Sequence, residues 1–223
     1  MLSVIGETLP LALGIAISPI PIIAAILMLL SPKARVTSVG LLLGWIVGII
    51  VAVVVFTLIS SVLPTQDSEA SSPVKGIIQL VLGLLLLLVA LRQWRGRPRG
   101  DQEPVLPKWM QAIDRVTFPV ALGLGFLLSA LNPKNLLMGA GAGVAIGGDA
   151  LDVGSVVVVI VVFVIIAAST VAIPVIAYLL AADRLRSPLD ALRDWLQKEN
   201  AVIMAVLLLV IGVSMIGKSF ASF

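Results

Sequence analysis

The chain has 223 residues, of which 60% are apolar and only 12% are charged, and its mean hydropathy is +1.16. Charged residues make up about a quarter of an ordinary soluble domain, so this composition excludes that class and indicates an integral membrane protein. The formal net charge is +3, and the sequence contains no cysteine and no histidine. These counts exclude a disulfide framework, a thiolate metal site and a histidine proton relay.

Six apolar segments are long enough to cross a hydrocarbon core about 30 Å thick. They are Thr8–Leu30, Val36–Leu63, Val74–Leu91, Phe118–Gly147, Val153–Ala182 and Ala201–Gly217. Barrel strands would show shorter, alternating segments, so the sequence predicts an all-α integral membrane protein with six transmembrane helices. The first segment follows an acidic residue and lacks a basic leader, so we expect it to be retained rather than cleaved as a signal peptide.

The first apolar segment contains a helix-start signal in its middle. Ser18 precedes Pro19, and Pro21 follows two residues later. A serine at an N-cap accepts a hydrogen bond from an unpaired backbone N–H, and a proline at the next position has no N–H to lose. We therefore expect helix 1 to be broken near the bilayer midplane, with the Ser18 side chain capping a half-helix that begins at Pro19.

The fourth apolar segment repeats this signal at Asn132 and Pro133, and Lys134 follows directly. Helix 4 is therefore also expected to be broken near the midplane. A lysine at membrane depth is costly, which indicates a functional residue. The alternative is that Lys134 snorkels to an interface, although it falls near the centre of its segment.

The two breaks occur early in two similar halves of the chain. Residues 1–92 form the first three-helix repeat, 93–117 a cytoplasmic linker with an interfacial helix, and 118–223 the second three-helix repeat. Because three spans are an odd number, the second repeat is inverted relative to the first. Two inverted repeats with interrupted spans are typical of secondary transporters.

The basic residues predict the orientation. Most of the 15 lysines and arginines fall in the Lys33–Arg35 turn and in segments 92–115 and 184–198. The positive-inside rule then makes these loops cytoplasmic and places both termini outside. Apolar residues at helical spacing predict surface helices near Trp109 and from Ser187–Pro188 onward, the latter separate from the last span.

Glycines recur every fourth residue on the second and fourth spans, at Gly40, Gly44 and Gly48 and at Gly139, Gly143 and Gly147. Such stripes let helix backbones approach closely. Packing within the chain is the main interpretation. The alternatives are the seam of a homodimer and one wall of a path that narrows and widens.

The breaks and the lysine together predict an anion site. Inverted topology points two half-helix N-termini at the midplane, and each carries a partial positive charge to which Lys134 adds a full one. The expected substrate-binding residues are Ser18, Pro19, Pro21, Ser129, Asn132, Pro133, Lys134 and Asn135. The acidic residues lie in loops or at segment ends, which disfavours a cation transporter. We expect no catalytic residue, no metal and no cofactor, and the chain is not expected to be an enzyme.

Two stretches carry a family resemblance. Residues 9–22, LPLALGIAISPIPI, and residues 130–135, ALNPKN, resemble the LysE transporter superfamily. Within it the chain is most similar to the GAP family of actinobacteria, the glycopeptidolipid- and sulfolipid-addressing branch. The resemblance implies a six-helix exporter of the inner membrane whose translocation site lies at the breaks around Pro19, Pro21 and Pro133.

Three functions follow as hypotheses. The first is export of a polar or anionic lipid of glycolipid type by alternating access around the two breaks. The second is export of amino acids or small organic anions, and the third is a membrane scaffold for lipid synthesis or export. The expected partners are membrane lipids and a lipid or small anionic substrate, with no nucleic acid, because the positive charge is explained by topology.

Overall fold

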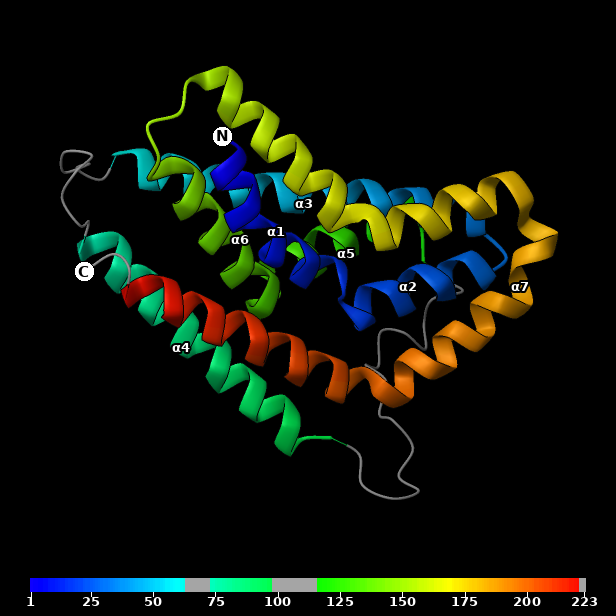
Figure 1. Cartoon of the computed structure of the whole chain (residues 1–223). Coiled ribbons are helices and arrows are strands. Elements are labelled where there is room, and N and C mark those ends of the chain that lie inside the picture. The colour runs from blue at the N-terminus through cyan, green and yellow to red at the C-terminus, as the bar shows by residue number, and fades with distance from the viewer. Residues whose placement is uncertain (63–72, 98–115, 221–223) are drawn as a thin grey trace.

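The computed structural model describes residues 1–62, 73–97 and 116–220 (Figure 1). Its secondary structure over these ranges is helical, which confirms the all-α class. The elements in order are α1 (Leu2–Ala16), α2 (Pro19–Leu30), α3 (Ala34–Val62), α4 (Pro73–Arg95), α5 (Phe118–Phe126), the π-helical turn η2 (Leu127–Leu131), α6 (Pro133–Gly147) and α7 (Val153–Phe220).

The helices are apolar and long enough for a multi-pass membrane protein. Within the described residues, four helices could each cross a bilayer: α3, α4 from Gly76, and two limbs of α7, Val153–Ala182 and Leu185–Phe220. Two further candidates are bent pairs, α1 with α2 at 50° and α5–η2 with α6 at 62°. The predicted segments therefore correspond to four straight candidates and two pairs bent where the Ser-Pro and Asn-Pro signals occur.

The second limb of α7 differs from the sequence prediction. The helix does not begin anew at Ser187, because the departure from helical backbone comes earlier, at Ala181 (φ −149°, ψ 53°), and Pro188 lies inside the helix. The segment expected to be a separate surface helix is therefore continuous with the last span. The other expected surface helix, near Trp109, lies outside the described residues.

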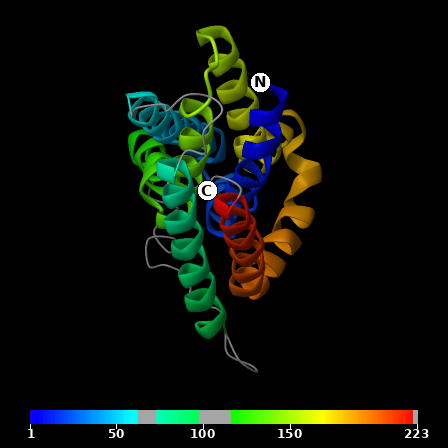
Figure 2. The ribbon, with the colours of Figure 1, turned by 60° about the vertical axis from the view of Figure 1, so that its left-hand side comes forward.

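The helices pack around the interior in two groups, one centred on α3 and the other on α7. α3 packs against α5, η2 and α6, while α1 and α2 lie against α7 (Figure 1). α4 packs along α7, and both views show it beside the C-terminal limb (Figures 1 and 2).

The glycine stripes bring α3 close to its neighbours. A Cβ added to Gly44 would overlap the carbonyl oxygen of Leu122 in α5, and one added to Gly143 of α6 would come within 2.5 Å of the Phe56 Cβ in α3. These positions exclude any side chain larger than hydrogen without movement of a neighbour. The stripes therefore serve packing within the chain, as the main interpretation predicted.

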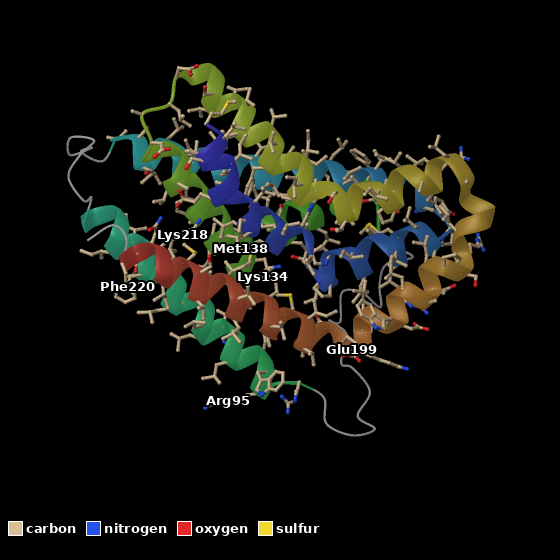
Figure 3. The ribbon with its side chains drawn as sticks, in the orientation of Figure 1. Arg95, Lys134, Met138, Glu199, Lys218 and Phe220 are labelled. Carbon is tan, nitrogen blue, oxygen red and sulfur yellow. The ribbon has the colours of Figure 1, made fainter. Side chains whose placement is uncertain are left out.

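The molecule has two distinct ends. Figure 3 shows Lys218 and Phe220 at one end and Arg95 and Glu199 at the other, with Lys134 between them. We refer to these as the Lys218 end and the Arg95 end. The positive-inside rule predicts that the Arg95 end is cytoplasmic.

Candidate substrate site

The two bent pairs meet at the middle of the molecule. The backbone leaves helical geometry at Ile17 and is extended at Ser18 (φ −107°, ψ 100°) before α2 begins at Pro19. It is extended again at Asn132 (φ −68°, ψ 120°), between η2 and Pro133 of α6. π-helical turns such as η2 occur frequently at functional sites.

Only one of the two predicted caps forms. The Asn132 side-chain oxygen accepts a hydrogen bond from the Lys134 backbone N–H at 3.1 Å, as expected for an N-cap. The Ser18 side chain caps no backbone N–H. Its hydroxyl instead accepts from the Lys134 Nζ and donates to the Asn135 Oδ1 at 3.2 Å. The prediction for Ser18 was therefore wrong, because a buried ammonium group is a stronger partner than a backbone N–H.

Lys134 joins the two breaks. Its side chain is 3% exposed, and its Nζ donates to the Gly14 carbonyl at 2.6 Å and to the Ser18 hydroxyl. The Ser18 N–H bonds to Ala16 instead of completing the helix to Gly14, so Lys134 supplies the donor that the Gly14 carbonyl lacks. A cation is also favoured at the C-terminus of α1 by the helix dipole. The lysine therefore points into the protein rather than to an interface.

Thr170 is a residue of this junction that the sequence analysis did not assign to the site. Its hydroxyl, on the first limb of α7, donates to the Ala16 carbonyl at the end of α1. The end of α1 is thus tied to α6 through Lys134 and to α7 through Thr170. No local sequence signal reports a bond between residues 154 positions apart.

Two of the predicted binding residues support the site without lining it. Asn135 is 1% exposed, and its Nδ2 donates to the Leu128 carbonyl of η2 at 2.9 Å while its Oδ1 accepts from Ser18. Ser129 donates to carbonyls of its own helix, and its hydroxyl occupies the space that a Cβ at Gly48 would take. Asn135 therefore positions Ser18, and Ser129 packs η2 against α3.

A cavity of about 310 Å³ lies between the two breaks, α4 and α7. Six of the predicted residues line it: Ser18, Pro19, Pro21, Asn132, Pro133 and Lys134. Five lining residues were not predicted: Ile20, Val89, Arg92, Gln93 and Met204. The part of the lining that the structure describes contains two cationic side chains and no acidic one. Among the residues that the structure describes, no group of three acidic side chains is placed to hold a metal ion.

The interior is closed between Lys134 and the Lys218 end. A Cβ at Gly14 would lie 2.5 Å from the Met138 sulfur and 2.6 Å from the Ile211 Cδ1, and Met138 is fully buried. Figure 3 places Met138 next to Lys134 on the side of Lys218. This apolar layer is tightly packed, so it separates the cavity from the polar residues beyond it.

A polar cluster covers the apolar layer at the Lys218 end. The Gln79 amide of α4 donates to the Glu7 carboxylate of α1 at 3.1 Å, and the Lys218 Nζ of α7 lies 4.0 Å from the same carboxylate oxygen. The space beside these residues is only about 20 Å³. The large cavity, in contrast, reaches Arg92 and Gln93 in the last turns of α4. The cavity therefore extends toward the Arg95 end and is sealed toward the Lys218 end.

The fold and the cavity together define a multi-pass membrane protein with a largely apolar cavity whose described lining includes two cations, Lys134 and Arg92. A protein-family model described as "Sap, sulfolipid-1-addressing protein" matches residues 8–221. The chain therefore belongs to this family of sulfolipid-addressing proteins. The comparison with curated proteins gives no match, and neither does the comparison with solved structures.

Proposed function

We propose that this protein is an inner-membrane transporter that exports a polar or anionic lipid of glycolipid type. The observation that carries the proposal is Lys134, a buried lysine held by a carbonyl and a hydroxyl. Among the described residues it has no ion pair, and no acidic side chain lines the cavity beside it. A buried cation without a counter-ion is costly, and a bound anion offsets that cost. The family description, which names a sulfolipid, supports an anionic lipid as the substrate.

Side chains supply most of the donors for that anion, because few backbone N–H groups line the cavity, among them that of Ile20. Pro19, Pro21 and Pro133 have no N–H, and the Lys134 N–H is used by Asn132. The Lys134 ammonium has three protons and donates two of them within the protein, which leaves one for a ligand. Recognition at the bottom of the cavity therefore depends mainly on this proton and on the positive charge.

The size of the cavity determines which part of a lipid it holds. Its volume of about 310 Å³ is at the lower limit for small-molecule pockets. That space accommodates a head group of about one sugar with its charged substituent, and it excludes long acyl chains. The acyl chains of the substrate would therefore remain among the apolar helix surfaces and the surrounding lipid while the head group occupies the cavity.

Alternating access explains why the cavity extends toward the Arg95 end and is closed toward the Lys218 end. We assign the structure to a state open toward the cytoplasm, with both termini outside and helices 1 and 4 broken as in the LysE superfamily. Export then requires the inverted three-helix repeats to rock against each other. That motion would separate the Met138 layer and the Glu7–Gln79–Lys218 cluster, and it would close the cavity near Arg92.

A second candidate function is export of small organic anions or amino acids, which the modest cavity volume favours. An amino acid would bring an ammonium group that needs an acidic partner, and the described lining of the cavity offers none. A small organic anion has no such requirement. The third hypothesis, a membrane scaffold, gives no role to a cavity lined by cations.

A transport assay separates these candidates. The purified protein in liposomes is given a fluorescent sulfated galactosyl lipid, its neutral galactosyl counterpart, and soluble galactose 3-sulfate. The proposal predicts movement of the sulfated lipid across the bilayer above the rate of empty liposomes, and slower movement of the neutral lipid. Movement of galactose 3-sulfate alone would favour the small-anion exporter, and movement of none of the three would contradict a transport function for these substrates.

A further inference from the structure

The cavity has a second cationic group at its mouth. Arg92 and Gln93 are adjacent residues in the last turns of α4, and both line the same cavity as Lys134. Pro21, Val89 and Met204 contribute apolar surface to the same cavity. The cavity thus has one set of polar groups at its bottom, with Lys134, and a second set at its mouth, Arg92 and Gln93, with apolar surface between them.

Arg92 offers hydrogen-bond donors for a ligand. Its side chain is exposed, and it has no hydrogen bond or ion pair in the described part of the chain, unlike Arg193, which pairs with Asp190 and Asp194. Its planar guanidinium has five N–H donors in a fork that fits two oxygens of a sulfate, phosphate or carboxylate group. Lys134 can offer only one free proton. The mouth of the cavity therefore has more available donors for an oxyanion than the bottom.

We propose that Arg92, assisted by the Gln93 amide, is the capture subsite for the oxyanion group of the substrate, a sulfate or phosphate ester on a polar head. The anion binds first at Arg92, near the predicted cytoplasmic surface, and then passes to Lys134. Within residues 1–62, 73–97 and 116–220, no acidic side chain lines the cavity to offset the charge of the two cations, and such a positive field concentrates anions at the mouth. This inference rests on the proposed function and names the chemical class that the same site selects.

Arg92 has an alternative, purely structural role. Arg92 and Arg95 both lie in the last turn of α4, where a cation interacts favourably with the helix dipole. Arg95 does not line the cavity. The variant Arg95→Gln therefore removes the same charge from the same helix end and is a matched control for Arg92→Gln.

The test measures binding and transport separately. The binding of galactose 3-sulfate and of neutral galactose to the detergent-purified protein is measured by ligand-induced thermal stabilisation. The initial rate of movement of the sulfated lipid is measured in liposomes over a range of lipid concentrations. The variants are Arg92→Gln, Arg92→Lys, Gln93→Ala and Arg95→Gln.

We expect Arg92→Gln to raise the half-saturating concentration of both sulfated probes about tenfold, the effect of losing one charge-assisted hydrogen bond. The maximal transport rate should stay within about a factor of two, because Lys134 is intact. Arg92→Lys should recover part of the affinity, Gln93→Ala should show a smaller loss, and Arg95→Gln should match the wild type.

Equal effects of Arg92→Gln and Arg95→Gln would overturn the proposal, and so would loss of the maximal rate without loss of affinity. Failure of the proposed function gives a different result. In that case the wild type moves no lipid. The binding assay still shows whether Arg92→Gln weakens the binding of galactose 3-sulfate more than Arg95→Gln does.

Discussion

Replacing Lys134 with methionine removes the ammonium group while keeping an unbranched side chain of similar length. The change removes the cost of a charge near the centre of a membrane helix, about 2.5–3.5 kcal/mol. It also leaves the buried Gly14 carbonyl without its donor at 2.6 Å, which costs about 1–3 kcal/mol. The Ser18 hydroxyl keeps its bond to Asn135. The two effects largely offset each other, so the free energy of unfolding should stay within about 2.5 kcal/mol of the wild type, a shift in Tm of at most about 10 °C.

Transport should respond differently from stability. Without the ammonium the anionic head group loses a charge-assisted hydrogen bond at the bottom of the cavity, so movement of the sulfated lipid should fall at least about tenfold. The assay is the liposome measurement of sulfated and neutral lipid, with thermal unfolding of each variant measured in parallel. Lys134→Arg should retain part of the activity, and Ser129→Ala, at a predicted residue that does not line the cavity, should behave as the wild type.

Two outcomes would refute this reasoning. Normal movement of the sulfated lipid by a folded Lys134→Met protein would show that the ammonium does not contact the substrate. A protein that folds as Lys134→Arg and fails to fold as Lys134→Met would show that the lysine is needed chiefly to cap α1.

Two further predictions concern packing and closure. Gly44→Ala should lower the free energy of unfolding by about 1–3 kcal/mol, because the new Cβ overlaps the Leu122 carbonyl. The control Gly123→Ala should not destabilise the protein, because nothing lies within 4 Å of its new Cβ. Equal thermal unfolding of the two variants would contradict the close approach of α3 and α5. Glu7→Gln should weaken the cluster at the Lys218 end. The reporter is a single cysteine in place of the buried Met215, beside the small cavity, and the probe is a thiol reagent that cannot cross the membrane. Glu7→Gln should raise the rate at which this cysteine reacts by a factor of roughly two to five. An unchanged rate would show that the cluster does not hold this end closed.

Local rules predicted the positions of the bends. Proline at the first helical position and an asparagine cap depend on neighbouring residues only, so Pro19, Pro133 and the Asn132 cap were read correctly from the sequence. The glycine stripes were equally informative, because periodic small residues have few purposes other than close packing.

Tertiary contacts explain what the sequence did not predict. The Ser18 hydroxyl bonds to residues more than a hundred positions away, and this competition defeats the local capping rule. Arg92, Met204 and Thr170 join the site only because α4 and α7 pack beside the breaks. The start of the second limb of α7 was misplaced because Ser-Pro is a strong helix-start signal wherever it occurs, although here the backbone had already turned at Ala181.

Binding of the lipid head group beside Lys134 is tested most directly by an experimental structure of the protein in a lipid nanodisc that contains the sulfated galactosyl lipid. We predict density for the sulfated head group inside the cavity, with sulfate oxygens at hydrogen-bond distance from Lys134 or Arg92 and the acyl chains outside the cavity. A head group bound elsewhere on the protein, with the cavity beside Lys134 filled by side chains, would contradict this prediction.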